Sequence, residues 1–470
     1  MTTIAPARYI ESRLDEYKGN PLAAALPQPL THEEFVGAIS YLPSFAEEER
    51  DYTEVERSAL AKRLQHCVVP TSIYFEFYEQ FYTLLLSGYL ARNPLDTETV
   101  AWNYDVSQNK SRPERTSAET LLLTGLSGNG KSTLVHSILR CFPQVIRHES
   151  YNDQPLVLDQ LVYLCVDIPA DASRKALLLA IIEAIDRAIG TDHAAQYRKL
   201  RVSVDAIQNA VETLCATYYV GVLILDEFQN VNIAKSGGQE TLLALLDSLV
   251  NNVRVPIVGV GTPDTYNLFR SVFRSARRSG TAGCLEVERP RSHDDSEWQS
   301  LCAVAWKSQW VQNASPLTED IIELVYHYTQ GLPAMLFRLM TLANKEAIAT
   351  GYEQLDERIL TETYDKHFRI VAPALSALRL GNYGDFEDLM TVRQLFEGGE
   401  GRAGLDRLLQ LARRSGLKKD TAKALSAMAR DAETEHDLSE DQQAELHQLR
   451  RHLEDEVFPD NPDASVANGS

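Results

Sequence analysis

The sequence predicts an α/β protein with a parallel β-sheet at its centre and helices after it. Between residues 118 and 290, short apolar runs alternate with helical patterns, which is typical of consecutive β-α-β units. One of these runs leads into a glycine-rich loop, and another ends in two adjacent acids. After Pro290 the strand patterns stop, and helical spacing covers residues 296–311, 317–328, 333–349 and 355–370.

The first strand, residues 120–124, runs into the segment GLSGNGKS and then into a helix-forming stretch. Its three glycines let successive backbone N–H groups converge on an anion, and the dipole of the following helix favours a phosphate there. Lys131 is placed to reach the β- and γ-phosphates, and the Ser132 hydroxyl to ligate Mg²⁺. We therefore predict that ATP, with Mg²⁺, binds at Gly125, Leu126, Ser127, Gly128, Asn129, Gly130, Lys131, Ser132 and Thr133.

Two carboxylates follow a second apolar strand, which covers residues 219–225. Because carboxylates at the end of a parallel strand emerge at the edge where ligands bind, Asp226 is expected to hold the metal from its outer coordination sphere, with Ser132 as the direct ligand. Glu227 is expected to orient or deprotonate the attacking water. The alternative is a pair of solvated acids in a turn, and the phosphate loop argues against it.

A third strand, residues 255–261, ends beside Thr262, which is placed to touch the γ-phosphate or the lytic water. Alone this is a weak signal, because Gly-Thr is an ordinary strand ending. Together the three motifs predict nucleotide hydrolysis or a nucleotide-controlled switch.

Bulk composition fits a globular protein of two to four domains, with 470 residues and 44% apolar content. No apolar run reaches the length of a membrane span, and the N-terminus shows no apolar signal core, so a cytoplasmic location is expected. The six cysteines form no CxxC pair and are interpreted as reduced thiols.

The net charge of −20 is unevenly distributed, because residues 431–470 carry twelve acids against two basic residues. The remaining chain contains local basic clusters, so a DNA-binding face is compatible with the global acidity. Unspecific coating of nucleic acid is disfavoured, since it requires a broadly basic surface.

Four regions are expected along the chain. They are a helical N-terminal extension for partner docking (1–115), a nucleotide-binding α/β core (116–290), a helical lid (291–380), and a C-terminal region whose acidic tail is partly disordered (381–470). The aromatic run 74–82 is interpreted as packed core or a partner-docking face, in preference to a base-stacking platform.

A parallel sheet with these three motifs, followed by a helical lid, resembles the layout of the AAA+ ATPases. Within that class the chain resembles TnsC proteins, which are related to the TniB group and regulate target-selective cut-and-paste transposons. The resemblance spans roughly residues 118–375 and rests on DIPADASRK (167–175), DEFQNV (226–231), AKSGG (234–238), VGTPD (260–264), FRSARR (273–278) and WKSQW (306–310).

This resemblance implies an ATPase that assembles head to tail into rings or filaments around double-stranded DNA. Its implied partners are a TniQ/TnsD-type target selector or an RNA-guided complex, a TnsB-type transposase and a TnsA-type endonuclease. ATP hydrolysis to ADP and phosphate would control assembly. The implied setting is the bacterial cytoplasm at the nucleoid, with no membrane involved.

Site residues outside the three motifs are also implied by the resemblance. A trans-acting arginine is expected at Arg277 or Arg278, with Arg274 as the second choice, unless this is simply a solvated basic helix face. DNA phosphates are expected to meet Arg174 and Lys175, with Arg198, Lys199 and Arg201 behind them, although basic residues at a helix start are often only solvated.

One position departs from the pattern of relatives, because Ala334 stands where some carry a lid arginine, and Arg338 lies one helical turn later as a substitute. Two other functions remain open. A helicase-loader or origin-type ATPase would show a C-terminal DNA-binding module, and a STAND-type nucleotide-switch scaffold would carry repeats after the lid. Neither feature is recognisable in the sequence.

Overall fold

A computed structural model describes residues 4–110, 118–169, 173–198, 202–233, 244–266, 281–369, 371–387, 389–390 and isolated positions between 408 and 453. The chain divides into two compact units. The first contains Met1–Tyr41 and Val68–Glu288, and the second contains Leu42–Cys67 and Arg289–Ser470. A short segment near the N-terminus therefore belongs to the same unit as the C-terminal helices.

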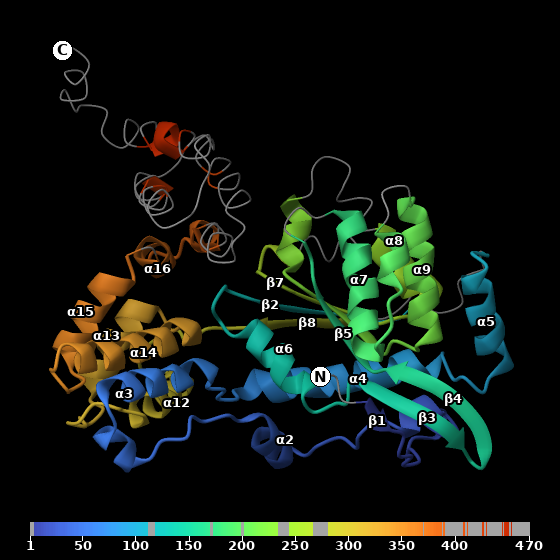
Figure 1. The fold of residues 1–470 in the computed structure, drawn as a ribbon, viewed down its shortest axis with the longest axis horizontal. Helices are drawn as coiled ribbons and strands as arrows, with labels where there is room; N and C mark the ends of the chain where they lie inside the picture. The colour runs from blue at the N-terminus through green and yellow to red at the C-terminus, as the bar shows by residue number, and fades with distance from the viewer. Residues whose placement is uncertain are drawn as a thin grey trace. The chain divides into compact units, whose positions relative to one another are not determined.

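The first unit is built on a five-stranded parallel sheet (Figure 1). Because all five strands run in one direction, the motifs that follow them meet at one edge of the sheet. Across the sheet the order is β5 (Tyr163–Asp167), β6 (Val222–Asp226), β7 (Ile257–Gly261), β2 (Thr120–Gly125) and β8 (Thr281–Val287).

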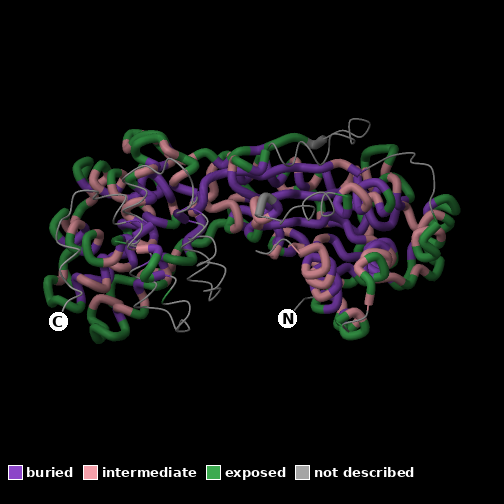
Figure 2. The backbone as a smooth tube through the Cα atoms, turned by 90° about the horizontal axis from the view of Figure 1, so that it is seen from above, coloured by how far each residue is buried: buried purple, intermediate pink, exposed green. Residues whose placement is uncertain are grey.

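The strands send alternate side chains into two separate cores, as the period of a β-strand dictates. In β6, Leu223 and Leu225 belong to one core, whereas Val222 and Ile224 belong to the other. Figure 2 shows this buried backbone running through the interior of the unit. The first core includes residues of α7 (Arg174–Ile189) and α9 (Val204–Thr217), and the second includes residues of α4 (Ser72–Leu90) and α6 (Lys131–Leu139).

Helix α4 carries the aromatic run 74–82, and its rings are core residues. Tyr74, Phe77, Tyr78 and Phe81 are all buried against the sheet side chains of the second core. The packed-core interpretation of this run is therefore confirmed.

A second, three-stranded sheet has the order β1 (Ile4–Pro6), β3 (Val145–Tyr151) and β4 (Gln154–Leu161). The β3–β4 hairpin turns through Asn152 and Asp153, both with positive φ, which is the backbone of a two-residue type I′ turn. β4 ends at Leu161 and β5 begins at Tyr163, so Val162 alone separates a strand of the small sheet from a strand of the large one.

Short helices complete the first unit. Helix α2 (His32–Ile39) begins with a capping box, in which the side chains of Thr31 and Glu34 each accept the other's backbone N–H. The remaining elements are η1 (Asp15–Tyr17), α1 (Pro21–Ala24), α2 (His32–Ile39), α5 (Thr97–Ser107), α8 (Ala194–Tyr197), η4 (Phe228–Ile233) and η5 (Leu249–Val253).

The second unit is helical, as the sequence predicted for residues after Pro290. Asp295, Thr318 and Asp356 cap helices with their side chains, and Pro333 occupies a first helical position. The elements are η2 (Glu47–Asp51), α3 (Glu54–Leu60), η3 (Ala61–His66), α12 (Ser296–Lys307), α13 (Glu319–Thr329), α14 (Pro333–Ala349), α15 (Glu357–His367) and α16 (Ala372–Arg379). In the part of the chain that the structure covers, no helix is both long and apolar enough to cross a bilayer.

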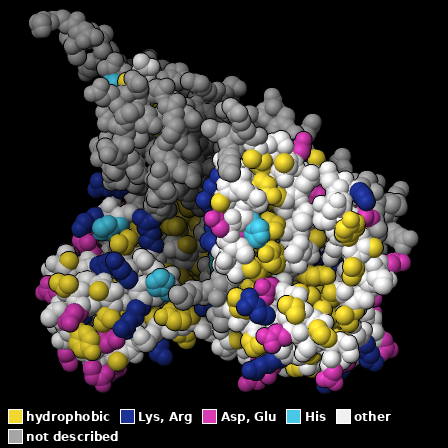
Figure 3. All heavy atoms as spheres, turned by 45° about the vertical axis from the view of Figure 1, so that its right-hand side comes forward, with side chains coloured by type: hydrophobic (Ala, Val, Ile, Leu, Met, Phe, Trp, Pro, Cys, Tyr) yellow, Lys and Arg dark blue, Asp and Glu magenta, His cyan; other side chains and the backbone are white. Residues whose placement is uncertain are grey.

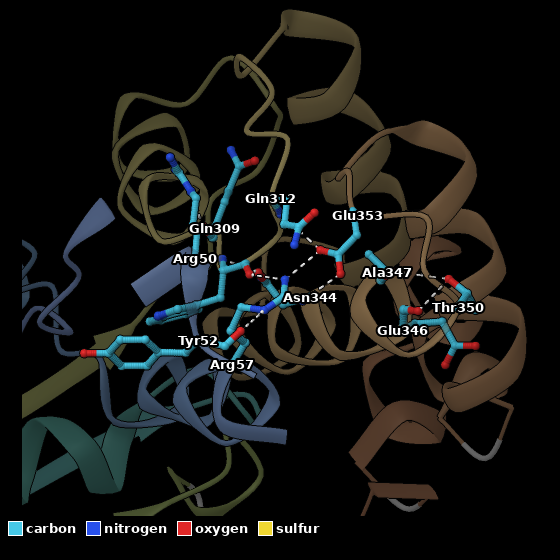
Figure 4. A network of polar contacts seen from close by, with 11 residues as sticks. Arg50, Tyr52, Arg57, Gln309, Gln312, Asn344, Glu346, Ala347, Thr350 and Glu353 are labelled. Carbon is cyan, nitrogen blue, oxygen red and sulfur yellow. Dashed lines mark hydrogen bonds and ion pairs between the residues drawn. The ribbon is translucent and has the colours of Figure 1, made fainter. Parts of the chain in front are cut away.

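A buried ion pair binds the N-terminal segment 42–67 into this unit (Figure 4). Arg57, which is 2% exposed, donates to both carboxylate oxygens of Glu353 at 2.6 and 2.7 Å. It also donates to the backbone oxygen of Trp310 at 3.0 Å, and the Trp310 indole N–H donates to Glu49 at 2.8 Å. Every contact joins segment 42–67 to residues more than 250 positions away, so long-range packing holds it.

Candidate functional site

The predicted phosphate loop links the end of β2 to the start of α6. Gly128 and Gly130 have φ values of 81° and 88°, a left-handed conformation that costs a glycine little and other residues more. Gly130 is also the N-cap of α6, so the first N–H groups of that helix open onto the loop. This is the local geometry that an anion-binding nest requires.

Lys131 bends back over the loop that it terminates. Its Nζ donates to the backbone oxygens of Gly125 at 2.8 Å and Leu126 at 3.1 Å. The ammonium group therefore lies at the loop, where the phosphates of a bound nucleotide would be.

The two predicted metal-holding side chains meet. The Ser132 hydroxyl donates to Oδ2 of Asp226 at 2.8 Å, although the two residues are 94 positions apart. Asp226 is buried, and its Oδ1 accepts the backbone N–H of Glu227 at 2.8 Å. A hydroxyl and a carboxylate oxygen side by side suit Mg²⁺, which binds through a few protein oxygens plus substrate phosphates.

Glu227 stands at the end of β6 in a left-handed backbone conformation, with φ of 55°. Burial raises the pKa of its carboxyl group, and the neighbouring Asp226 carboxylate raises it further, whereas Lys131 acts in the opposite direction. Asp167 pairs in register with Asp226 across β5 and β6, and its pKa is also raised by desolvation and by Asp226. A carboxylate with a raised pKa is a stronger base, which suits it to accept a proton from water.

Thr262 follows β7 and is buried at the same edge. Its backbone N–H donates at 3.3 Å to Oε1 of Gln229, and the Nε2 of Gln229 donates to a carboxylate oxygen of Glu227. Gln229 was not among the predicted site residues, although it lies in the motif DEFQNV two residues after Glu227.

The predicted DNA-contact residues that the structure describes make contacts within the first unit. Arg174 donates to Gln208 and forms an ion pair with Asp205 at 3.4 Å, and Arg198 pairs with Glu183 at 2.9 Å. Lys175 is half-buried near the start of α7. On the face shown in Figure 3, basic side chains lie among acidic and apolar ones.

Several predicted residues lie outside the described part of the chain. These are the arginine-finger candidates Arg274, Arg277 and Arg278 and the DNA candidates Lys199 and Arg201. In the second unit, Arg338 on α14 places its guanidinium 5.6 Å from the centre of the Phe368 ring. Ala334 lies in the first turn of the same helix.

Residues 106–279 match the profile of a family described as "Bacterial TniB protein". This stretch contains the phosphate loop, the two acids, Thr262 and all the arginine-finger and DNA candidates. The resemblance to TniB proteins is thereby confirmed for this part of the chain. No protein of curated function matches the sequence.

Solved structures show a low overall similarity to this chain. A Walker-type ATPase of Pyrococcus abyssi is 14% identical, covering 76% of this chain and 89% of its own, with a TM-score of 0.35. The RuvB Holliday junction branch migration motor of Thermotoga maritima is 15% identical, covering 60% and 74%, with a TM-score of 0.31. PCH-2 of C. elegans is 11% identical, covering 64% and 69%, with a TM-score of 0.32.

The fold class predicted from the sequence is confirmed. The first unit is of the α/β class, with a parallel sheet that gathers the three predicted motifs at one edge, and the second unit is helical.

Proposed function

We propose that this chain, which carries a TniB-type ATPase domain across residues 106–279, regulates DNA transposition by assembling on duplex DNA under the control of ATP. In this role it links a TniQ/TnsD-type target selector, or an RNA-guided complex, to a TnsB-type transposase. A TnsA-type endonuclease is a further partner. The hydrolysis of ATP to ADP and phosphate controls when the assembly forms and disperses.

The observation that carries the proposal is the contact between Ser132 and Asp226 inside the TniB-matched region. It joins the phosphate loop to the acidic strand end, although the segments are far apart in sequence. That junction is what an ATPase needs, because the nucleotide, the metal and the attacking water must share one place.

The chemistry of the site follows from the described residues. The backbone N–H groups of residues 126–130 and the Lys131 ammonium would bind the phosphates, and Ser132 and Asp226 would hold Mg²⁺. Mg²⁺, when bound, neutralises charge on the phosphate oxygens. Glu227 orients the attacking water and accepts its proton, and Thr262 lies at the same edge to contact the γ-phosphate or that water.

Assembly is proposed to run head to tail, with nucleotide at each junction. A heterologous interface of this kind closes into a ring or continues as a filament. Arg277, Arg278 or Arg274 would then reach the nucleotide of the neighbouring subunit, an arrangement worth about 10³–10⁵ in rate in other phosphoryl-transfer proteins. Arg174 and Lys175, followed by Arg198, Lys199 and Arg201, are the proposed contacts to DNA phosphates.

The test is to incubate the purified full-length chain with Mg²⁺, labelled ATP and linear duplex, measuring nucleotide retention and imaging the particles by electron microscopy. We expect retained ATP and oligomers that encircle DNA. ATP retained by monomers that do not bind DNA would support the nucleotide-switch scaffold instead. No retention of ATP would overturn the ATPase assignment itself.

The acidic segment 431–470 suits a basic DNA-processing partner through charge complementarity. We expect its deletion to leave ATP turnover within about twofold of wild type and to weaken capture of the transposase in a pull-down. If the shortened chain captures the transposase as strongly as the full-length chain does, at both low and physiological salt, the segment only solubilises the chain.

A further inference from the structure

The side chain of Gln229 lies between two parts of the proposed catalytic edge that come from different strands. Its Nε2 donates to Oε2 of Glu227 at the end of β6, and its Oε1 accepts the backbone N–H of Thr262 after β7. Gln229 therefore makes contact with both the proposed water-activating carboxylate and the neighbouring strand end.

The orientation of this amide is fixed by chemistry. A carboxylate only accepts hydrogen bonds, and a backbone N–H only donates them. Turning the amide over would set its oxygen against the Glu227 carboxylate and its NH₂ group against the Thr262 N–H, losing both bonds. Only the observed orientation satisfies both partners.

The surrounding backbone is shaped to hold this side chain. Phe228 is fully buried and anchors the turn that carries Gln229. Asn230 makes a separate hydrogen bond, donating from Nδ2 to the Ile168 oxygen at 2.8 Å, and does not contact Gln229 through it. At Gly261, an added Cβ would lie 3.0 Å from Oε1 of Gln229 and 2.7 Å from Cγ2 of Thr265. The close approach of β7 to Gln229 thus depends on glycine at this position.

We propose that Gln229 is a positioning residue, which fixes the Glu227 carboxylate relative to the end of β7 so that its second oxygen faces the attacking water. This inference rests on the proposed ATPase function. Gln229 does not itself touch the reacting atoms. Oε2 of Glu227 accepts the hydrogen bond from the Gln229 amide, which leaves Oε1 for the water. Because the same amide accepts the Thr262 N–H, the position of Glu227 depends on the segment that contains Thr262.

A comparison of two neighbouring substitutions in the full-length protein tests this role. Gln229→Leu removes both amide contacts at similar size, whereas Asn230→Ala removes a hydrogen bond of the same turn that does not involve Glu227. We expect Gln229→Leu to lower kcat by between about tenfold and 100-fold, with the Kd for ATP within about twofold of wild type. Asn230→Ala is expected to keep kcat within about threefold of wild type.

A double mutant separates positioning from general loosening of the fold. If Gln229 acts through Glu227, then adding Gln229→Leu to Glu227→Gln should change the residual turnover by less than about twofold. Gln229→Glu provides a second variant should Gln229→Leu fold poorly. It places a second carboxylate against Glu227, and an equal or larger fall in kcat is expected.

Three results would overturn the inference while leaving the ATPase assignment intact. They are wild-type kcat in Gln229→Leu, an equal fall in Asn230→Ala, and a full additional loss in the double mutant. A wild-type protein that neither binds nor hydrolyses ATP would overturn the proposed function, and with it this inference.

Discussion

Carboxylates at the proposed nucleotide edge of the sheet and in the helical unit have pKa values shifted in opposite directions. At the sheet edge the pKa values of Glu227 and Asp167 are raised, because burial and the nearby Asp226 disfavour their charged forms. In the helical unit the pKa of Glu353 is lowered, because it accepts hydrogen bonds from Arg57. The first arrangement leaves carboxylates ready to take up protons, and the second neutralises the charge within the fold.

The direction of the pKa shift separates charges that stabilise the fold from charges available to a ligand. Arg57 and Glu353 satisfy one another across 296 positions and hold segment 42–67 in place. Ser132, Asp226 and Glu227 lie together with Lys131, and in the proposed function a phosphate and a cation would bind between them. Substitutions in the two regions should therefore affect different measurements.

The largest effect is expected from Lys131→Ala, because the loop then loses the cation that meets the β- and γ-phosphates. ATP binding, measured by filter retention of labelled nucleotide, should fall below detection, and turnover should fall with it. Lys307→Ala removes an exposed lysine of the helical unit and serves as the control. Unchanged affinity in Lys131→Ala would contradict the assignment of the phosphate loop.

The next effect is expected from Glu227→Gln, which removes the proton acceptor but keeps the side chain's size. Turnover should fall by about 10²–10⁴-fold, with ATP still bound. ATP-loaded oligomers should then persist on DNA, which is measured as dissociation after dilution. Dissociation at the wild-type rate would show that Glu227 does not activate the water.

A stability effect without loss of nucleotide binding is expected from Glu353→Gln. This change leaves the Arg57 charge buried without its anionic partner, at a cost of about 3–5 kcal/mol. Urea unfolding followed by tryptophan fluorescence is a suitable measurement, because Trp298, Trp306 and Trp310 lie in this unit.

Two further variants sharpen this test. Glu362→Gln breaks an exposed pair with Arg358 in the same unit and should leave the urea midpoint nearly unchanged, because solvent screens exposed pairs. Adding Arg57→Met to Glu353→Gln removes the stranded charge and should restore part of the lost stability. Equal costs for Glu353→Gln and Glu362→Gln would contradict the structural role of the buried pair.

The grouping of the three motifs at one edge of the sheet was predictable from the sequence because each motif is continuous. The phosphate loop and the adjacent acids Asp226 and Glu227 are short motifs whose residue types indicate phosphate and metal binding. The strand pattern before each motif places them at one edge of the sheet. The structure adds that Ser132 and Asp226 touch. The sequence left that contact open, because the order of strands across the sheet decides it.

Features held by long-range contacts were not predictable. Gln229 gains its role only because β7 approaches it at Gly261, and segment 42–67 joins the helical unit through Arg57 and Glu353. The β3–β4 hairpin was missed although the turn residues Asn152 and Asp153 signal it, because its strands are rich in polar side chains.

The smallest expected effect is on the pH dependence of stability, which has opposite signs for Glu227 and Glu353. The raised pKa of Glu227 means that the folded protein binds this proton more tightly than the unfolded chain, whose pKa is about 4.3. Below that value Glu227 is protonated in both the folded and the unfolded state, so it does not lower the free energy of unfolding. Stability is then lost as pH rises through the folded pKa. Glu227→Gln should therefore raise the melting temperature at pH 7 by about 1–3 °C, without nucleotide or Mg²⁺, and leave it unchanged near pH 4.

For Glu353 the lowered pKa reverses this dependence. Its contribution is present above the unfolded pKa and is lost as pH falls through the folded value, so Glu353→Gln should destabilise most at neutral pH and least in acid. Melting curves of both variants at pH 4 and pH 7 test the comparison directly. A lower melting temperature for Glu227→Gln at pH 7 would show that this carboxylate is stabilised by the fold, as Glu353 is, and would remove the proposed distinction between the regions.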